Sequence, residues 1–450
     1  MGKENTVRIM LPEQVKQILN TLRENGFEAF AVGGCVRDSL LGRVPGDWDI
    51  TTSAHPEDVK KIFKRTVDTG IEHGTVTVLL KAGENAAPGH SGFNGYEVTT
   101  YRIDGEYRDG RHPEAVSFTP SLSEDLKRRD FTINAMAYSE ADGLVDLFQG
   151  LSDLEEGVIR CVGNPDDRFS EDALRILRAV RFAAQLDFTV ETKTEEAIRS
   201  HAENLLKVSR ERIQAELSKL LCSPHPERTA ELFHLGLAAY LCEGFPEVVP
   251  QIYTELRASL GQAETGKEDA EEAEAGALLF SAVPLSRKYL RYAVMLAEME
   301  EKKAGSLLQA LKLDNDTIKK TRTLVSYLFS PIAPDRYELK KVMQQMTPEL
   351  MRELLLLKQA FSRTARYRRH CPEEDAGKLL GLLSEIERRE EPVYPGDLIL
   401  RGSDLIAAGM EPGPELGRIL AEMLDDVQHN PVHNSVLYLI SQYVAKKRGK

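Results

Sequence analysis

The chain has 450 residues, of which 42% are hydrophobic and 29% charged, so it resembles a globular protein too long for a single core. No apolar run approaches the roughly 18 residues of a membrane span, and the polar N-terminus does not resemble a signal peptide, so we expect a cytoplasmic protein. The five cysteines are scattered and lack C-x-x-C spacing, which argues against a disulfide framework or a zinc site.

The net charge of −13 argues by itself against a nucleic-acid partner, but the charges are unevenly distributed. Residues 261–276 hold six acids and one lysine and are predicted to form a solvated acidic loop. Residues 341–370 hold seven Lys and Arg against two Glu. The run 363–369 fits a phosphate-contact patch and a solvated helix face equally well. Charge therefore neither supports nor excludes RNA.

Up to about residue 150, short strand-like runs alternate with helical runs, which predicts a small α/β or α+β domain with one sheet. The predicted strands are 28–32, 47–52, 75–81, 96–102 and 115–119, the predicted helices are 11–24, 35–41 and 56–63, and residues 82–95 are predicted to form a hairpin loop. From about residue 170 the apolar spacing is that of amphipathic helices, with breaks predicted at 331–334 and 392–395. We expect a catalytic head followed by an all-helical remainder.

The segment 31–49 combines a double glycine, an arginine and two carboxylates. Gly34 stands at the strand-to-helix junction, where backbone N–H groups can approach a phosphate. If Asp47 and Asp49 begin a strand, they share one face about 7 Å apart, and Trp48 faces the other way. Two such carboxylates can hold Mg²⁺ against a triphosphate. Either motif alone is more often a loop or a turn, but together they predict a metal-dependent nucleotidyl transferase.

Two further segments fit this chemistry. Glu97 lies in a strand-like run and becomes a third carboxylate if that strand neighbours the aspartates; an exposed strand position is an equal alternative. The loop 103–114 has more charge than a passive turn needs, with Asp104, Arg108, Asp109 and Arg111, which favours a functional role over a plain hairpin.

Two basic segments follow. Lys127, Arg128 and Arg129 stand beside a predicted helix of small apolar residues, and one of them could neutralise a triphosphate; an ordinary basic turn is the alternative. Farther on, Asp172, Arg175, Arg178 and Arg181 recur every three residues and are expected on one helix flank, with Leu174, Leu177, Val180 and Ala184 on the buried side. Such pairs are usually surface ion pairs, but three arginines facing one or two acids suggest an anionic ligand.

Asp172 and Arg175 together offer an acceptor beside a donor. Cytosine and adenine each present an amino donor next to a ring-nitrogen acceptor and satisfy that pair, whereas guanine and uracil present the reverse. Unpaired buried groups cost enough free energy to discriminate strongly. This predicts a pocket that accepts CTP and ATP and rejects GTP and UTP.

These motifs resemble those of the class II tRNA nucleotidyltransferases, or CCA-adding enzymes, and their close kin, the bacterial poly(A) polymerases. The resemblance runs in order through GGCVRDSLLG (33–42), DWD (47–49), YEVTTYR (96–102), DGEYRDGRHPE (104–114), DLKRRDFTINAMA (125–137), EDALRILRAVRFA (171–183) and VSRERIQAEL (208–217). A tail segment, GSDLIAAGMEPGPELGRIL (402–420), is similar to the tRNA-binding tail of the short Bacillus-type enzymes. The acidic segment 261–276 has no counterpart, and no His-Asp doublet of the phosphohydrolase domain of some relatives occurs.

The resemblance implies an α+β, polymerase-β-like head (1–150), a helical neck with the base pocket (151–222), a helical body (223–335) and a tRNA-binding tail (336–450). It implies Asp47 and Asp49 as Mg²⁺ ligands and Glu97 as a third carboxylate. The residues implied for nucleotide binding are Gly34, Arg37, Arg129, Asp172, Arg175, Arg178 and Arg181. CTP, ATP and the tRNA acceptor end are the implied partners, no membrane is implied, and a homodimer is left open.

The implied reaction is template-independent addition of C, C and A to the tRNA 3′ end with release of pyrophosphate. Rival interpretations are a poly(A) polymerase and enzymes adding only CC or only A. The loop 103–114, which CC-only members lack, favours full addition, and the GRRF-type polymerase signature is absent; residues 62–68 read IFKRTVD instead. An RNA-binding protein on an inactive transferase fold would be expected to lack a metal ligand, yet both aspartates are present.

Overall fold

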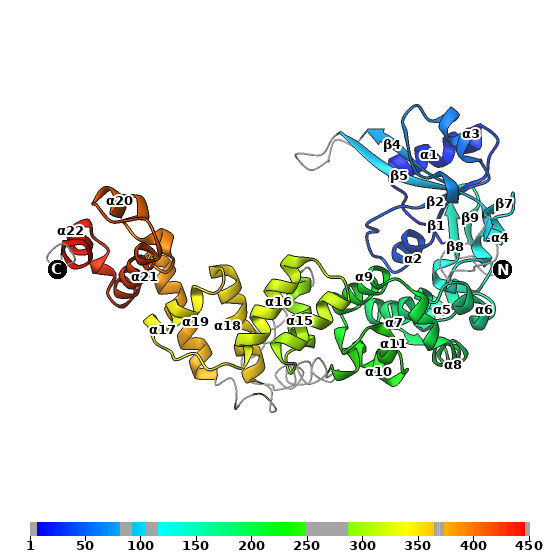
Figure 1. Ribbon diagram of the computed structural model, residues 1–450. Coiled ribbons are helices and arrows are strands. Elements are labelled where there is room, and N and C mark those ends of the chain that lie inside the picture. The colour runs from blue at the N-terminus through cyan, green and yellow to red at the C-terminus, as the bar shows by residue number, and fades with distance from the viewer. Residues whose placement is uncertain are drawn as a thin grey trace, which may run out of the picture. The chain divides into compact units, whose positions relative to one another are not determined.

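The computed structural model describes residues 7–81, 92–104, 116–248, 287–363, 367, 369 and 373–445. The chain divides into two compact units, Met1–Pro246 and Glu247–Lys450 (Figure 1). The finer division into head, neck, body and tail stays a prediction.

A mixed seven-stranded sheet lies at the centre of the N-terminal part of the first unit, in the order β3-β4-β5-β2-β1-β8-β9 (Figure 1). Its strands are β1 (Ala29–Val32), β2 (Ile50–Thr52), β3 (Thr66–Gly70), β4 (Thr75–Lys81), β5 (Phe93–Thr100), β8 (Met136–Ser139) and β9 (Gly143–Asp146). β2 and β5 are parallel, and the other neighbours are antiparallel. The apolar run of β1 is buried along its whole length, as its central position requires.

Four helices accompany this sheet: α1 (Glu13–Glu24), α2 (Gly34–Leu40), α3 (Pro56–Ile62) and α4 (Leu122–Lys127), with the 3-10 turns η1 (Ile71–His73) and η2 (Thr132–Asn134). Helix α1 buries Val15, Ile18, Leu19 and Leu22, the i, i+3, i+4, i+7 stripe that faces a core. The predicted helices and four of the predicted strands therefore coincide with main elements.

Three expectations about this region were wrong. A second, two-stranded sheet of β6 (Arg102–Asp104) and β7 (Val116–Phe118) stands apart from the main sheet, so the strand predicted at 115–119 does not join it. Strands β3, β8 and β9 have no predicted counterpart, and the helix expected beyond Arg129 is instead η2 followed by strand β8. The apolar run there is small and buried on every side, so its period does not distinguish helix from strand. Residues 82–91 of the predicted hairpin loop lie outside the described residues, although β4 and β5 pair up to Lys81 and Phe93.

The rest of the first unit is mostly helical. It contains α5 (Gly150–Glu156), α6 (Pro165–Glu171), α7 (Leu174–Leu186), α8 (Thr192–His201), α9 (Arg210–Leu221), α10 (Glu231–His234) and α11 (Ala238–Leu241), the short parallel pair β10 (Val158–Ile159) and β11 (Thr189–Val190), and the 3-10 turns η3 (Ala202–Lys207), η4 (Pro226–Ala230) and η5 (Phe245–Glu247). Helix α7 is buried along nearly its whole length, including all four residues predicted for its buried side.

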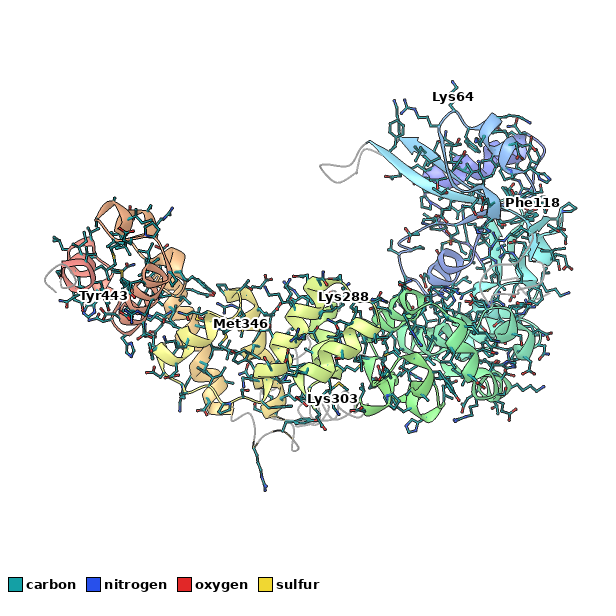
Figure 2. All side chains as sticks on the ribbon, viewed as in Figure 1. Lys64, Phe118, Lys288, Lys303, Met346 and Tyr443 are labelled. Atoms are coloured by element: carbon teal, nitrogen blue, oxygen red, sulfur yellow. The ribbon has the colours of Figure 1, made fainter. Side chains whose placement is uncertain are left out.

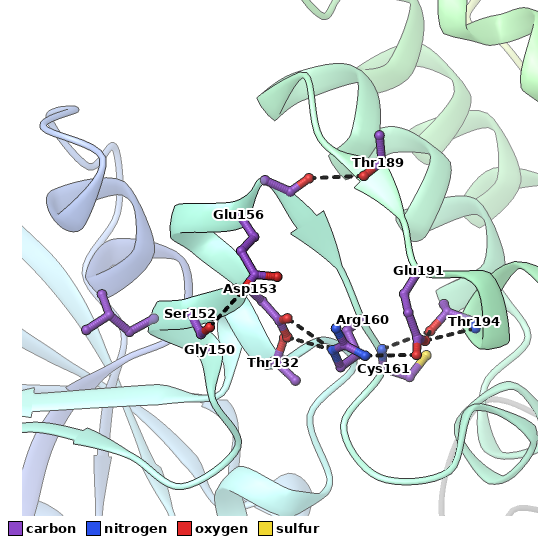
Figure 3. Close-up of polar contacts among 12 residues, drawn as sticks. Thr132, Gly150, Ser152, Asp153, Glu156, Arg160, Cys161, Thr189, Glu191 and Thr194 are labelled. Carbon is purple, nitrogen blue, oxygen red and sulfur yellow. Dashed lines mark hydrogen bonds and ion pairs between the residues drawn. The ribbon is translucent and has the colours of Figure 1, made fainter.

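A polar cluster joins α5 to the β10–β11 pair (Figure 3). Arg160 contacts Asp153 at 3.0 Å and Glu191 at 2.8 Å, and Thr132 donates to the buried Asp153 at 2.6 Å. Gly150 makes this approach possible, because a Cβ there would lie 2.3 Å from the Thr132 carbonyl oxygen. The cluster thereby connects η2 to the helical part of the first unit.

The described part of the second unit contains helices and no strand. They are α14 (Lys288–Met295), α15 (Glu301–Ala310), α16 (Asn315–Leu328), α17 (Arg336–Met343), α18 (Pro348–Ser362), α19 (Glu373–Arg388), α20 (Gly402–Ala407), α21 (Pro414–His429) and α22 (Val436–Leu439), with the short turns η6 (Pro395–Asp397), η7 (Pro431–His433) and η8 (Ile440–Ala445). Both predicted proline breaks fall between helices, at 331–334 and 392–395. Within the described ranges, no helix combines the length and apolar character that crossing a membrane requires.

The basic run 341–370 lies in the second unit, which contains partners for three of its cations. Lys358 is buried and donates to the carbonyl oxygens of Leu328 and Ser330. Lys341 pairs with Asp425, and Arg352 pairs with Glu387. These three cations therefore have partners within the chain. The acidic segment 261–276 lies outside the described residues.

Candidate active site

A polar cleft of about 770 Å³ lies at the junction of β2, β4 and β5. It is lined by Gly46, Asp47, Trp48, Asp49, Thr77, Phe93, Asn94, Gly95, Tyr96 and Glu97. Strand β2 begins at Ile50, so Asp47 and Asp49 lie in the connection before it and not on a strand as predicted. Trp48 lines the same cleft as its neighbours, which corrects the expectation that it faces away. Parallel pairing of β2 with β5 brings Glu97 to the two aspartates.

The carboxylates of this cleft influence one another. Burial raises the pKa of Asp49, the charge of Asp47 raises it further, and the charge of Arg129 opposes both. The pKa of Glu97 is raised by burial and then by the charges of Asp49 and Asp47. No ion pair in the described part of the chain involves any of these three acids. The cleft therefore carries negative charge that Arg129 compensates only in part, and this charge favours a further cation.

These residues fit a Mg²⁺ site of a particular kind. Among the described residues, no three His, Cys, Asp or Glu side chains are close enough together to hold a metal on their own. Mg²⁺, however, is usually bound through one or two carboxylates together with water and substrate phosphates. Asp47 and Asp49 supply such a pair of hard oxygen ligands in a polar cleft.

The double glycine has the local geometry that the motif predicts. Gly33 has φ +81° and is the N-cap of α2, and Gly34 is the first helical residue. A Cβ at Gly33 would lie 2.9 Å from Nη1 of Arg129, so a side chain there would displace that guanidinium. The backbone at the start of α2 and the Arg129 side chain therefore lie against each other.

Arg129 is held by Asp125, a carboxylate that is itself bonded to the sheet. It pairs with Asp125 at 3.5 Å, as Arg128 does at 2.8 Å. Burial raises the pKa of Asp125, but the charges of the two arginines outweigh that effect and lower it below its ordinary value. Thr51 on β2 donates to Asp125 at 3.1 Å. The buried carboxylate of Asp125 therefore holds Arg129 beside β2, the strand that follows Asp47 and Asp49.

The Arg37 side chain, on α2, is buried. Its Nη1 donates to Asn134 Oδ1 at 2.6 Å, and Asn134 donates to Asp130 at 3.2 Å. Asp130 in turn pairs with Arg178 at 2.5 Å. Burial raises the pKa of Asp130, but Arg178 and Arg175 outweigh it and hold it at about 2. A continuous chain of polar contacts thus links α2 to α7.

Each of the three arginines of α7 has an acidic partner, and two of these partners lie outside the motif in which the excess was counted. Asp172 lies two residues before the first residue of α7 and accepts from the Leu174 N–H at 3.0 Å, so it is not on the flank of that helix. Each arginine pairs with an acid of another segment: Arg175 with Glu171 at 2.7 Å, Arg178 with Asp130, and Arg181 with Glu216 at 2.5 Å. Glu171 is the last residue of α6 and also pairs with Arg168, Asp130 lies between α4 and η2, and Glu216 lies on α9. Two of the three acids thus come from segments that a count along the motif cannot include.

The two residues predicted to read the base have separate partners. Asp172 also accepts from Arg212 at 2.7 Å, and Arg175 donates to the carbonyl oxygen of Arg128 at 2.9 Å. In the described part of the chain their side chains make no hydrogen bond to each other, and the only bond between them is from the Arg175 backbone N–H to the Asp172 carbonyl oxygen, at 3.0 Å. Each Asp172 oxygen retains a second lone pair, and the Arg175 guanidinium has further N–H groups.

Phe182 is the centre of the arginine cluster and was missed at the sequence level. The guanidinium carbons of Arg37, Arg178 and Arg181 lie 5.0, 5.3 and 3.9 Å from its ring centroid. Asp130, Asn134, Arg212 and Glu216 were also missed. The signal that could have revealed them was the unbalanced arginine count, which requires acids from elsewhere in the chain. The predicted functional loop 103–114 lies outside the described residues from position 105 onward.

Comparison with known proteins agrees with this architecture. The family model "Poly A polymerase head domain" matches residues 29–160, "Probable RNA and SrmB- binding site of polymerase A" matches 187–250, and a tRNA nucleotidyltransferase domain 2 model matches 286–442. The CCA-adding enzyme of Enterococcus faecalis is 38% identical over 445 residues, 98% of each chain, and that of Limosilactobacillus reuteri is 35% identical over 439 residues, 96% of each chain.

A solved structure matches over the same extent. The Bacillus stearothermophilus CCA-adding enzyme in complex with CTP superposes with a TM-score of 0.75 at 30% identity, covering 98% of this chain and 100% of that one. The expected α+β head with a mixed sheet, followed by helices, is confirmed. This chain belongs to the CCA-adding enzyme family and is a tRNA nucleotidyltransferase.

Proposed function

We propose that the carboxylate cleft and the arginine cluster divide the work of CCA addition between them. The enzyme adds C, C and A to the tRNA 3′ end from CTP and ATP, without a nucleic-acid template, and releases pyrophosphate. The observation that carries the division of roles is the cleft itself, where Asp47, Asp49 and Glu97 meet and the pKa values of Asp49 and Glu97 are raised even though the charge of Arg129 acts on Asp49. Its negative charge suits metal binding, and the neighbouring arginines suit a triphosphate.

Asp47 and Asp49 are the proposed Mg²⁺ ligands, and Glu97 adds negative charge beside them. Mg²⁺ held there supplies charge stabilisation for the phosphates and lowers the pKa of an attacking hydroxyl. The contribution of the chain is to hold Asp47 and Asp49 in the connection directly before β2 and Glu97 on β5, which pairs in parallel with β2. Positioning of this kind supplies much of the rate enhancement in phosphoryl transfer.

The triphosphate is proposed to lie at the start of α2, against Gly34 and Arg129, with Arg37, Arg178 and Arg181 behind them. Arg129 lies at the N-cap glycine of α2 and also acts electrostatically on Asp49, so it stands between the helix start and the carboxylates. Guanidinium groups and backbone N–H groups are both suited to phosphate oxygens. The buried polar chain from Arg37 to Arg178 keeps the cluster rigid.

Asp172 and Arg175 are proposed to read the base. Their remaining acceptor and donor groups match the Watson–Crick edges of cytosine and adenine. A base that presents a carbonyl beside an N–H would leave both groups unpaired, which costs free energy. Cytoplasmic tRNA processing and formation of a homodimer belong to this proposal; sedimentation of the purified enzyme tests the second.

One experiment tests the activity and its rivals together. Three tRNA transcripts, ending before CCA, after C and after CC, are incubated with enzyme, Mg²⁺ and labelled CTP, ATP or both, and products are resolved to one nucleotide. Completion of CCA on all three is the expected result. Addition of C alone to the first, of A alone to the third, or of long A ladders would instead identify a CC-adding enzyme, an A-adding enzyme or a poly(A) polymerase. Bound but unextended tRNA would indicate an inactive fold.

A further inference from the structure

The strands β3, β4 and β5 have one packed face and one open face. Val76, Val78 and Val98 are buried, and in the antiparallel register Val76 pairs with Val98. Because side chains alternate along a strand, the opposite face carries Thr77 of β4 and, on β5, Phe93 and Glu97. The open face therefore continues the carboxylate cleft outward from Glu97.

An aromatic ring and a guanidinium lie together on this open face. The guanidinium carbon of Arg65 is 4.3 Å from the centroid of the Phe93 ring. Arg65 is exposed, and no ion pair within the described ranges involves it. Val67, on the same face of β3, is 46% exposed, and the exposed Lys81 pairs in register with Phe93. One ring and two cations therefore lie on the open face, beside a cleft whose acids are Asp47, Asp49 and Glu97.

The part of the cleft between Phe93 and Glu97 is called the hollow here, and Gly95 lies between these two residues on β5. A Cβ there would lie 2.9 Å from Thr77 Cγ2 and 3.6 Å from Leu79 Cδ2, so a side chain would have to displace its neighbours across the strands. Gly95 lines the cleft between Phe93 and Glu97, on the same face as both. The Thr77 and Leu79 side chains pack over the Gly95 backbone, and the polar cleft beside them accommodates a planar group between the ring and the carboxylates.

The position of this hollow in the strand order indicates which reactant it binds. In the order β3-β4-β5-β2-β1-β8-β9, the aspartates precede β2, and α2 with Arg129 belongs with β1 on one side of them. Phe93 and Arg65 lie on β5 and before β3, on the other side. An in-line displacement needs the attacking group on the side of the reacting phosphorus opposite the leaving phosphates. With the triphosphate at α2, the hollow faces the acceptor end.

We propose that Phe93 and Arg65 form a subsite for the 3′-terminal nucleotide of the acceptor RNA, with the base stacked on Phe93 and a backbone phosphate at Arg65. This inference rests on the proposed function, since it takes the acceptor hydroxyl to reach the Asp47–Asp49 cleft. Aromatic stacking combined with a cation is the general means by which proteins hold single-stranded nucleic acid without reading its sequence. Such tolerance suits a site whose terminal base changes after each addition.

The test separates binding of the acceptor from binding of the nucleotide. Steady-state kinetics are measured with Phe93→Ala, Phe93→Tyr and Arg65→Ala on the transcript that ends before CCA. Phe93→Ala is expected to raise KM for the transcript about tenfold while KM for CTP stays within about twofold, and Phe93→Tyr restores the wild-type value. Arg65→Ala is expected to raise KM for the transcript and to reduce the salt dependence of its binding by about one phosphate contact.

Lys64→Ala is the matched control. Lys64 is the adjacent exposed cation, and it projects outward from the segment before β3 (Figure 2). It is expected to leave both KM values unchanged, and thermal unfolding of every variant checks that the fold is retained. The inference is overturned if Phe93→Ala leaves KM for the transcript unchanged, or raises KM for CTP instead, which would make the hollow a nucleotide site.

A second readout follows stacking directly. A transcript whose terminal base is 2-aminopurine is expected to lose fluorescence on binding the wild-type enzyme and to lose clearly less with Phe93→Ala. Equal quenching by both would contradict the proposal. Failure of wild-type enzyme to extend any transcript would refute the proposed function, which is a separate outcome from an unaffected KM in a working enzyme.

Discussion

The two halves of the active site differ in how their charges are compensated. In the arginine cluster, Arg175, Arg178 and Arg181 each have an acidic partner of the same chain. In the cleft, Asp47, Asp49 and Glu97 have no ion pair within the described residues, and the pKa values of Asp49 and Glu97 are raised. One half is complete without a ligand, whereas the other is electrostatically incomplete.

This difference has a physical consequence. A buried cation without a partner would be costly, and the arginine cluster, which is the proposed triphosphate site, contains internal acids and a central ring, Phe182. The cleft is partly exposed, and water can screen its carboxylates until a cation arrives. The arginine cluster should therefore respond to mutation in stability, and the cleft in activity alone.

The largest expected effect is in the cleft. Asp49→Ala should lower kcat by about 10³-fold, because the metal supplies several kcal/mol of transition-state stabilisation. The melting temperature should stay the same or rise, since removing Asp49 relieves its repulsion with Asp47 and Glu97. Single-turnover extension and calorimetry measure the two quantities. Asp58→Asn, on the exposed side of α3, is the control, and near-normal turnover of Asp49→Ala would refute the assignment.

The second expected effect is a loss of stability in the arginine cluster. Glu216→Gln removes the charged partner of Arg181 at a site where both side chains are less than 10% exposed, 6% and 8%. Leaving that guanidinium unpaired should reduce the free energy of unfolding by about 3 kcal/mol, measured by urea denaturation. Glu195→Gln breaks the exposed pair with Arg199 and should cost at most about 0.5 kcal/mol. Equal costs for the two variants would remove the contrast between the halves.

A smaller effect is expected in nucleotide choice. Asp172→Ala and Arg175→Ala should lower the preference of kcat/KM for CTP over UTP by roughly tenfold or more, because each variant removes one of the two groups that only cytosine and adenine satisfy. Competition of labelled CTP with UTP on the transcript ending before CCA measures this preference. An unchanged preference in both variants would show that the base is read elsewhere.

The smallest effect concerns pH. The pKa of Asp130 lies near 2, below its ordinary 3.8, so its carboxylate stabilises the folded state above about pH 4, and that contribution is lost as the pH falls towards 2. The loss should amount to about 2 kcal/mol in the free energy of unfolding. Urea denaturation at pH 4, 3 and 2 should show a shallower pH dependence for Asp130→Asn than for the wild type. Parallel curves would contradict the assignment of this carboxylate.

Sequence patterns predicted the local geometry wherever neighbouring residues decide it. Gly33 at a strand-to-helix junction requires a left-handed backbone, and it has φ +81°. The apolar spacing of α7 likewise predicted four of its buried residues, but Arg175 and Arg181 of the predicted polar flank are buried as well. The predicted start of the strand at Asp47 was wrong, because β2 begins only where pairing with β1 and β5 begins, at Ile50. Pairing partners, which no local pattern specifies, determined that boundary.

What the sequence by itself determined is the chemistry: the aspartate pair, the double glycine, the arginine series and the order in which they occur. Only the tertiary structure decided the partners, because Arg178 meets an acid 48 residues away and Arg181 one on a different helix. The open face with Arg65 and Phe93 has the same origin, since β3 and β5 come together only through β4. Spacing along one element sets the direction of a side chain, but packing between elements sets what it meets.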